Sequence, residues 1–216
     1  MPRIQIRFTM AFKHIKDEEC ERINRLQADY FSRVKQVFDP PYPEGVPERL
    51  EIIVKAAEIK TSDTVVDIGS GTGVLIPLIQ GFNPEMIYAN DLSKSMLSSV
   101  KERYQGVLTI LGGIRNLALP DHSVDVFLIN ACYPNLVDKD RSFKNIARML
   151  KPWGRVIISH PMGRSFTDFL KREMPFPVDD FPVSLPEAGN LFKPYGFRVR
   201  TLIDHENLYL LILEWG

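Results

Sequence analysis

The sequence predicts an α/β protein with a mostly parallel β-sheet, an antiparallel last strand and helices on both faces of the sheet. Two observations carry this prediction. Short apolar runs alternate with amphipathic segments along most of the chain, which indicates strands connected by crossover helices. Near the C-terminus, two strand-like runs over 197–203 and 208–215 are separated only by the polar stretch DHEN. That stretch is too short for a crossover helix, so we expect an antiparallel hairpin.

The N-terminal part is predicted to be a helical cap. Apolar residues recur at spacings of three and four between residues 16 and 38, which indicates one face of an amphipathic helix. The prolines of DPPYPEG cannot continue this helix. A second helix over 47–58 leads into the first strand. The predicted organisation is a cap segment over 1–48 and one domain over 49–216.

Five strand-like runs lie between the cap and the hairpin. They are TVVDI (64–68), MIYAN (86–90), GVLTIL (106–111), VDVFLIN (124–130) and RVIISH (155–160). Helix-like segments separate most of them, including SKSMLSSVKERY and KDRSFKNIARML. Within the fourth run, Asp125 is expected to be a structural acid at the start of its strand.

Composition and charge narrow the function classes. The 216 residues are 44% hydrophobic and 25% charged, with a formal net charge of zero. A neutral chain lacks a broad basic surface, so no nucleic-acid partner is expected. The N-terminus has no secretory apolar region and no later run could span a bilayer, so we expect a cytoplasmic protein without a membrane span. Cys20 and Cys132 have no metal-ligand spacing and are expected to be ordinary thiols.

The stretch TVVDIGSGTGVLIPLI is a glycine-rich turn of the type that brings a nucleotide-like ligand close to the backbone. Gly69, Gly71 and Gly73 alternate. Val74 stands where a dinucleotide-binding G-x-G-x-x-G pattern needs its third glycine. The Lys-Ser or Lys-Thr pair of a P-loop is absent from the sequence here. Asp67, two residues before the first glycine, would repel a pyrophosphate.

A ligand with a cationic amine and no phosphate suits this turn better. Asp67 offers an acid for an amine, and Asp91 ends the second strand at the carboxyl edge of the sheet, where open α/β folds bind ligands. A carboxylate there can accept hydrogen bonds from both hydroxyls of a ribose. Ser93 is placed to cap the next helix. These features together fit S-adenosylmethionine.

Four motifs in order, VVDIGSGTGVL, ANDLSKSML, LPDHSVDVFLIN and LKPWGRVIISH, resemble those of class I (Rossmann-like) S-adenosylmethionine-dependent methyltransferases. The resemblance runs from about Arg49 to the C-terminus. Within the superfamily, the chain is most similar to the ubiquinone/menaquinone-biosynthesis type and its small-molecule relatives. The resemblance implies the strand order 3-2-1-4-5-7-6, with S-adenosyl-L-methionine as the cofactor.

The resemblance also implies a cofactor site. Its residues would be Asp67, Gly69, Ser70, Gly71, Gly73, Asp91, Leu92, Gly113, Ile114 and Asn130. The glycines would pass under the methionine part, and Asp67 would organise that loop or meet the amine. Asp91 would hold the ribose, with Leu92 against the adenine, and Asn130 would lie at the methionine end. In many relatives a Gly-Asp-Ala triplet follows the third strand and its acid contacts the adenine amino group. Here Gly113 stands in place of that acid.

Candidate catalytic residues follow the fourth and fifth strands. The sulfonium of the cofactor makes its methyl group electrophilic, so the protein needs mainly to align a nucleophile and exclude water. A base is needed only if the nucleophile loses a proton. His160 is a candidate base or substrate contact, with a structural histidine as the alternative. Tyr133 is the second candidate, with simple loop packing as its alternative. The stretch NACYP is not the Asn/Asp-Pro-Pro-Tyr pattern of many amino-group methyltransferases.

Candidate substrate-binding residues come from the cap and from the loops after these strands. They are Tyr30, Phe31, Tyr133 and Arg164. The first two, with Phe176 and Phe181 of the segment 174–189, could form a roof over an apolar acceptor, and core packing of that segment is the alternative. Arg164 with His160 could accept an anionic substrate, and a solvated arginine is the alternative. No carboxylate cluster marks a metal site, so no metal is predicted, and Asp138 and Asp140 are expected at a helix start.

The leading hypothesis is a methyltransferase that acts on a small, partly hydrophobic molecule. A non-catalytic S-adenosylmethionine-binding subunit or scaffold of the same fold is the alternative, motivated by the missing acid at Gly113. A protein or RNA methyltransferase is disfavoured by the neutral charge and the lack of an appended recognition domain. The sequence shows no paired acids of the kind that an aminopropyltransferase would need to bind a polyamine. Val74 and Asp67 disfavour an oxidoreductase.

Overall fold

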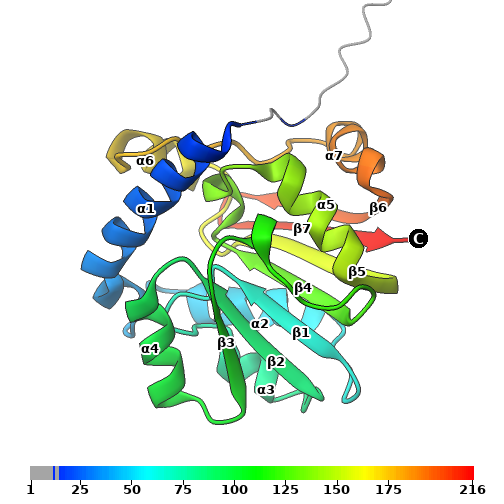
Figure 1. The fold of residues 1–216 in the computed structure, drawn as a ribbon, viewed down its shortest axis with the longest axis horizontal. Coiled ribbons are helices and arrows are strands. Elements are labelled where there is room, and N and C mark those ends of the chain that lie inside the picture. Colours follow the sequence, from blue (N-terminus) through cyan, green and yellow to red (C-terminus); the bar gives the residue numbers. More distant parts are fainter. Residues whose placement is uncertain (1–11, 13–14) are drawn as a thin grey trace, which may run out of the picture.

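The structure, a computed structural model, describes residue 12 and residues 15–216. Its centre is a seven-stranded sheet with the strand order β3-β2-β1-β4-β5-β7-β6 (Figure 1). This confirms the strand order that the resemblance implied. Residues 1–11, 13 and 14 of the predicted cap lie outside the described residues, and the division of the chain at residue 48 stays a prediction.

The strands agree closely with the predicted runs. They are β1 Thr64–Ile68, β2 Met86–Asp91, β3 Val107–Leu111, β4 Val124–Asn130, β5 Leu150–His160, β6 Phe197–His205 and β7 Leu208–Trp215. The strands β1 to β5 pair in parallel, whereas β7 is antiparallel to both β5 and β6. The predicted hairpin is therefore confirmed. β5 begins earlier than predicted because Leu150 pairs with Val124 ahead of a register shift.

Helices connect most of the strands. They are α1 Asp17–Arg33, α2 Val46–Ala56, α3 Ile76–Gln80, α4 Lys94–Arg103, α5 Lys139–Met149, α6 Phe166–Glu173 and α7 Leu185–Phe192. Short 3-10 turns are η1 Lys35–Phe38, η2 Ile114–Asn116, η3 Tyr133–Asn135 and η4 Lys193–Tyr195. The predicted first helix is thus divided, because the chain leaves the α conformation at Val34, where φ is −104° and ψ is 15°.

Side-chain caps explain where several elements begin. Asp138 Oδ1 accepts a hydrogen bond from Arg141 N at 3.1 Å, which confirms Asp138 at a helix start. Ser93 Oγ accepts from Met96 N at 3.2 Å, as predicted for the cap of α4. Asp125 Oδ2 accepts from the backbone N–H of Thr64 at 2.8 Å and therefore ties β4 to the start of β1.

Two apolar cores lie on opposite faces of the sheet. Val65 and Val66 are neighbours in β1 and point to opposite faces, because side chains alternate along a strand. Val65 belongs to the core that includes residues of α2, α3 and α4, and Val66 to the core that includes residues of α5 and α7. Helices therefore cover both faces, as the sequence predicted.

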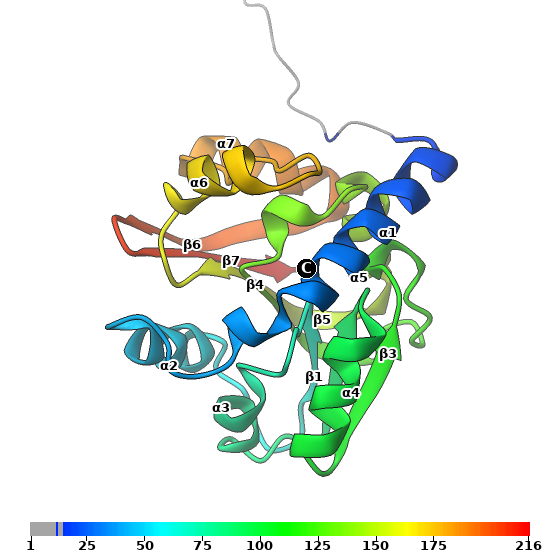
Figure 2. The same cartoon turned by 90° about the vertical axis from the view of Figure 1, so that its left-hand side faces the viewer.

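α1 crosses the carboxyl ends of the strands and covers neither face of the sheet (Figure 2). Its side chains reach loops that follow different strands. Ser32 Oγ lies 2.7 Å from Ser93 Oγ, just after β2. Gln27 Nε2 donates to Asn135 O at 2.8 Å, after β4. The edge of the sheet that carries the predicted site is therefore roofed by the N-terminal helix.

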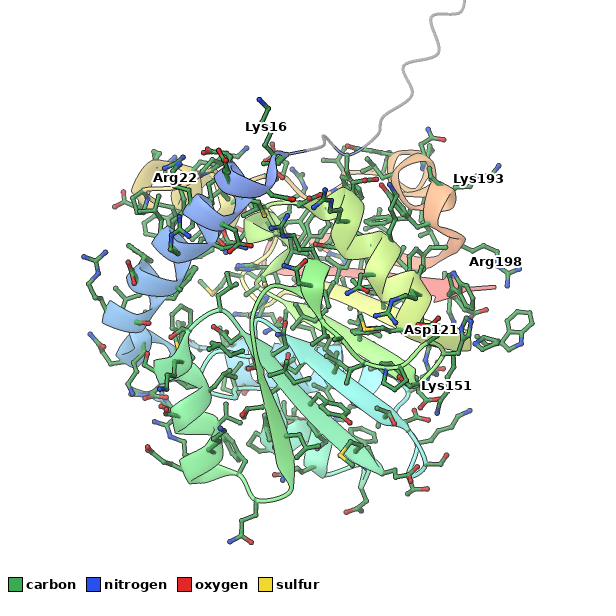
Figure 3. The ribbon with its side chains drawn as sticks, viewed as in Figure 1. Lys16, Arg22, Asp121, Lys151, Lys193 and Arg198 are labelled. Atoms are coloured by element: carbon green, nitrogen blue, oxygen red, sulfur yellow. The ribbon has the colours of Figure 1, made fainter. Side chains whose placement is uncertain are left out.

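The outside of the molecule carries charges of both signs. Lys16, Asp121 and Lys151 are among the labelled side chains that point outward in Figure 3. Across the described part of the chain, no helix combines the length and the apolarity needed to cross a membrane.

Candidate cofactor and active site

A cavity of about 330 Å³ lies between α1, α2 and the carboxyl ends of the central strands. It brings together most of the residues predicted for the site. Those that line it are Phe31, Gly69, Ser70, Gly71, Asp91, Leu92, Gly113, Ile114, Asn130 and His160. The remaining predicted residues lie elsewhere, and their places are given below.

The glycine turn after β1 exposes bare backbone to this cavity. Gly69 and Gly71 have φ values of +64° and +55°, in the left-handed region that favours glycine. A Cβ on Gly69 would lie 2.4 Å from Cys132 Sγ, whereas a Cβ on Gly71 would meet nothing within 4 Å. Gly73 does not line the cavity, and a Cβ on it would lie 2.5 Å from the ring of Tyr104. Within this turn, Gly71 is thus the point where a ligand can approach the backbone most closely.

Asp91 is fixed at the end of β2 by backbone N–H groups. Its Oδ2 accepts from Gly71 N at 2.9 Å and its Oδ1 accepts from Ser93 N at 2.8 Å. Burial raises the pKa of Asp91 above its ordinary value, and these hydrogen bonds act in the opposite direction. Each carboxylate oxygen has a second lone pair, so Asp91 can still accept two hydroxyl groups from a ligand.

Asp67 lies behind the glycine turn and does not line the cavity. Burial raises its pKa to about 8, and the neighbouring charge of Asp91 adds to the effect. Asp67 is therefore mostly protonated at neutral pH, and this environment favours its role in organising the turn over a charge contact with an amine.

S-adenosylmethionine fits this part of the cavity on three observations. Gly71 leaves open space, Asp91 presents a fixed carboxylate, and the buried Ser70 Oγ in the cavity wall has no hydrogen-bond partner among the described residues. Buried polar atoms are rarely left unpaired, so an unpaired atom in a cavity wall marks a place for a ligand or water.

The loop after β4 closes the next part of the wall. Asn130 Oδ1 accepts from Ser159 Oγ at 3.0 Å, which links the ends of β4 and β5. Ala131 has a φ of 54°, an uncommon value for a residue with a Cβ. Such backbone strain is frequent at ligand sites, where the surrounding structure holds it in place.

His160 ends β5 inside the cavity wall, and its side chain is buried. Its Nδ1 accepts a hydrogen bond from Met162 N at 3.1 Å. Burial lowers the pKa of His160 to about 4, so the ring is neutral at pH 7. In a neutral imidazole that accepts at Nδ1, the proton resides on Nε2. The free ring nitrogen is thus a hydrogen-bond donor.

Tyr133 lies outside the cavity, in the apolar core. Its ring stacks on Phe181 at a centroid distance of 5.4 Å, and Lys139 Nζ lies 4.9 Å from the ring centroid. The candidate role of Tyr133 in catalysis or substrate binding is therefore replaced by its alternative, loop packing. The reason is the 3-10 turn η3, which directs the ring into the core.

The predicted aromatic roof is only partly assembled. Phe176 packs on both Tyr30 and Phe31 with centroid distances of 5.7 Å, but only Phe31 lines the cavity. Phe181 is a core residue. Arg164 does not line the cavity either; its Nε donates to Asp204 Oδ2 at 2.9 Å in a half-exposed ion pair. An anion site formed by Arg164 and His160 is therefore not assembled.

A second set of wall residues was missed by the sequence analysis. They are mostly apolar and come from η1, the proline-rich linker, α2, the loop after β5 and the start of α6: Val37, Phe38, Tyr42, Pro43, Val46, Leu50, Met162 and Phe166. The linker DPPYPEG, followed at once by an amphipathic helix, was the available signal. Asn24, Gln27 and Arg115 also line the cavity and were missed. Among the described residues, no group of histidines, cysteines and acids is arranged to hold a metal ion.

Comparisons with known proteins agree with this geometry. A family model described as a methyltransferase domain matches residues 66–158. The ubiquinone/menaquinone biosynthesis C-methyltransferase of Vibrio campbellii is 32% identical over an alignment of 156 residues, which covers 66% of this chain and 58% of that protein. The chain thus spans little more than half the length of this curated relative.

Solved structures share the fold. One is a methyltransferase of Haloferax volcanii that was solved in complex with the Trm112 methyltransferase activator. Its TM-score is 0.70 at 18% identity, and the match covers 87% of this chain and 96% of that chain. An S-adenosylmethionine-dependent methyltransferase of Mesorhizobium loti has a TM-score of 0.64 at 17% identity, covering 79% of this chain and 100% of its own. At these identities the likeness establishes the fold alone.

Proposed function

Because a methyltransferase-domain model matches residues 66–158 and the chain has the fold of S-adenosylmethionine-dependent methyltransferases, we propose that it is a class I (Rossmann-like) enzyme that transfers a methyl group from S-adenosylmethionine to a small, partly hydrophobic molecule. The observation that carries this proposal is the division of the cavity wall. One part consists of the glycine turn and Asp91, and another part, from η1 to α2 and after β5, is almost entirely apolar.

The cofactor part of the site would be held by groups already described. Asp91 would accept the ribose hydroxyls, and the backbone at Gly69 and Gly71 would pass close to the methionine part. Asn130, fixed by Ser159, would meet the methionine end. When bound, S-adenosylmethionine supplies a methyl group that is electrophilic because it is carried on a sulfonium. The protein then has to align an acceptor and keep water out.

The apolar part of the wall suits a neutral acceptor. Phe38, Tyr42, Leu50 and Phe166 exclude water and offer no charge to pair with an ionic group. His160 would orient the acceptor by donating from Nε2 to an oxygen or nitrogen of the substrate. A ring with a pKa of about 4 is a weak base, so this role is favoured over proton removal.

The named relative gives the first acceptors to test. Because the Vibrio campbellii protein is named for ubiquinone and menaquinone biosynthesis, quinol and phenol acceptors come first, followed by amines. Calorimetric titration with S-adenosylmethionine, S-adenosylhomocysteine and NAD would precede the turnover assays. We expect binding of the first two ligands and none of NAD.

Asp91→Asn should weaken the binding of both S-adenosylmethionine and S-adenosylhomocysteine, since it replaces one strongly accepting carboxylate oxygen. Asp121→Asn is the matched control, because Asp121 is an exposed acid that pairs with Arg148 far from the cavity. Absence of binding to S-adenosylmethionine would refute the proposal. Binding with no turnover on any acceptor would favour a non-catalytic cofactor-binding subunit of the same fold.

A further inference from the structure

The loop after β3 contains a glycine that its own backbone does not require. Gly113 has a φ of −79° and a ψ of 146°, an extended conformation that any residue can adopt. A Cβ there would lie 3.4 Å from Asn24 Nδ2 and 3.7 Å from Leu92 Cδ2. A longer side chain would extend toward the amide of Asn24. The space beside Gly113 is therefore filled by a side chain from α1.

Asn24 has the chemistry to recognise an adenine. It is half-buried and lines the cavity together with Leu92, Gly113 and Ile114. Within the described residues its one hydrogen bond is a 3.8 Å contact from Nδ2 to Cys20 Sγ, and sulfur is a weak acceptor. A carboxamide presents an acceptor and a donor side by side. This arrangement pairs with the 6-amino group and an adjacent ring nitrogen of adenine.

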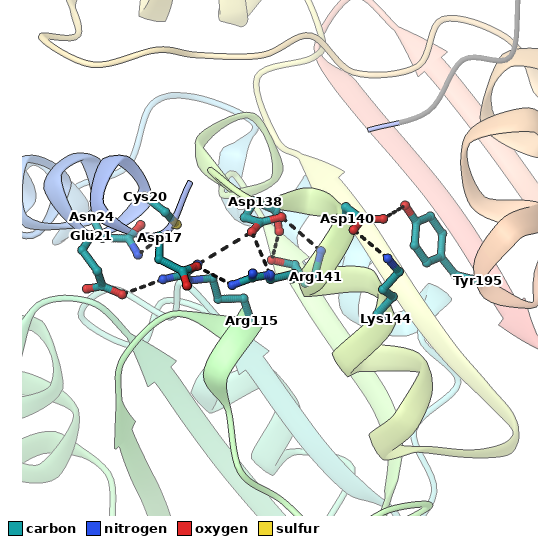
Figure 4. Close-up of polar contacts among 11 residues, drawn as sticks. Asp17, Cys20, Glu21, Asn24, Arg115, Asp138, Asp140, Arg141, Lys144 and Tyr195 are labelled. Carbon is teal, nitrogen blue, oxygen red and sulfur yellow. Dashed lines mark hydrogen bonds and ion pairs between the residues drawn. The ribbon is translucent and has the colours of Figure 1, made fainter. Parts of the chain in front are cut away.

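Ion pairs hold α1 against the same loop (Figure 4). Arg115 follows Gly113 by two residues and donates to Asp17 at 2.9 Å and to Glu21 at 2.8 Å. Its side chain is only 6% exposed. Because Glu21 and Asn24 are three residues apart, they lie on one side of the helix. The pairing of Arg115 with α1 therefore fixes Asn24 beside the loop after β3.

Most other polar groups near this loop are committed elsewhere. The amide nitrogen of Asn90 donates to Ile110 O and Gly112 O, and Arg115 has no acceptor. Two competing acceptors line the same cavity. Asp138 Oδ2 lies 3.7 Å from nitrogens of Arg115 and Arg141 and thus faces two guanidinium groups. Asn135 Oδ1 has no hydrogen-bond partner among the described residues, but unlike Asn24 neither residue comes within 4 Å of the Cβ position at Gly113.

We propose that Asn24 of α1 accepts a hydrogen bond from the 6-amino group of the cofactor's adenine and so makes the N-terminal helix part of the cofactor site. This inference rests on the proposed function. It also explains how the chain can hold adenine without an acid at Gly113.

The test is a thermodynamic cycle in which one side chain and one ligand group are removed separately and together, with each binding affinity measured by calorimetry. Wild-type protein and Asn24→Leu are titrated with S-adenosylhomocysteine and with its analogue whose purine lacks the 6-amino group. Leucine keeps the branched shape of asparagine, with the same number of heavy atoms, but has no amide. We expect the wild type to prefer the adenine ligand by about five- to tenfold, the value of one net hydrogen bond. The variant should bind both ligands equally, which would show the coupling.

Three further variants sharpen the result. Asn24→Asp keeps the shape and an acceptor, so it should keep the preference. The double variant Asn24→Ala/Gly113→Asp should regain it, because a carboxylate then occupies the vacated space. Arg22 lies on the exposed side of α1 and, among the described ion pairs, pairs only with Glu19. Arg22→Leu therefore serves as the helix control, and its preference for the adenine ligand should be unchanged.

The outcomes separate this inference from the proposed function. If Asn24→Leu keeps the wild-type preference for the adenine ligand, the inference is overturned. If Asp138→Asn in addition loses that preference, Asp138 is the acceptor instead. Failure of the wild type to bind S-adenosylhomocysteine would refute the proposed function itself, and the role of Asn24 with it.

Discussion

Gly69 and Gly71 provide a sharp test of the glycine turn, because their surroundings differ while their backbones are alike. Each Gly→Ala change forces a Cβ into the left-handed region, which costs about 1–2 kcal/mol. At Gly69 the new methyl would also lie 2.4 Å from Cys132 Sγ and 2.8 Å from its Cβ, and such overpacking costs about 1–3 kcal/mol more. We therefore expect Gly69→Ala to lower the free energy of unfolding by about 2–5 kcal/mol and Gly71→Ala by only about 1–2 kcal/mol.

The assay is urea-induced unfolding followed by circular dichroism, with Cys132→Ala completing a double-mutant cycle. Removal of the sulfur leaves the contact between the two Cβ atoms, so Cys132→Ala should recover part of the loss in Gly69→Ala, about 1 kcal/mol or more. It should recover nothing in Gly71→Ala. Additive effects of Gly69→Ala and Cys132→Ala would refute the packing argument. In binding experiments the order should reverse, because only the Gly71 methyl projects into open space of the cavity.

Further predictions concern protons and the acceptor. The pKa of Asp67 is raised to about 8, so folding favours its protonated form, and this stabilisation is lost as pH rises from about 4 through 8; urea unfolding at several pH values should show a smaller decline in Asp67→Asn. His160, with a pKa lowered to about 4, should titrate near that value by NMR and destabilise the fold as pH falls from 6.5 toward 4; a midpoint near 6.5 would contradict its burial. Phe38→Ala should raise the KM for an apolar acceptor while the Kd for S-adenosylmethionine stays unchanged, and a cofactor Kd that rises with it would place Phe38 in the wrong part of the cavity.

The elements that local patterns specify could be predicted from the sequence. The apolar runs fix the strands, the short DHEN turn fixes the hairpin, and the glycine turn with Asp91 marks the cofactor end of the cavity. α7 was missed because the prolines of 174–189 resemble a loop. The stretch SLPE nevertheless carried a helix-start signal, since Ser184 Oγ accepts from Glu187 N at 3.3 Å and Val183 N donates to Glu187 Oε2 at 2.8 Å.

Side-chain directions were harder to predict. Tyr133 stands in the loop after β4, near residues that line the cavity, yet the turn η3 places its ring in the core. Asn24 shows the opposite case, because nothing local reveals which residue of α1 meets Gly113. That contact depends on how the helix crosses the sheet edge, and it becomes visible only in three dimensions.

The crossing of α1 over the sheet edge also buries a thiol whose reaction rate can report on openings of the site. Cys20 is 1% exposed on the underside of this helix, and burial raises the pKa of its thiol, so the folded form presents almost no thiolate to a reagent. Alkylation of Cys20 thus requires the structure around it to open, and the alkylation rate reports how often such openings occur. A cofactor bound beneath the helix would slow this alkylation, so the alkylation rate of Cys20 would report how often the site opens to bind and release its ligand.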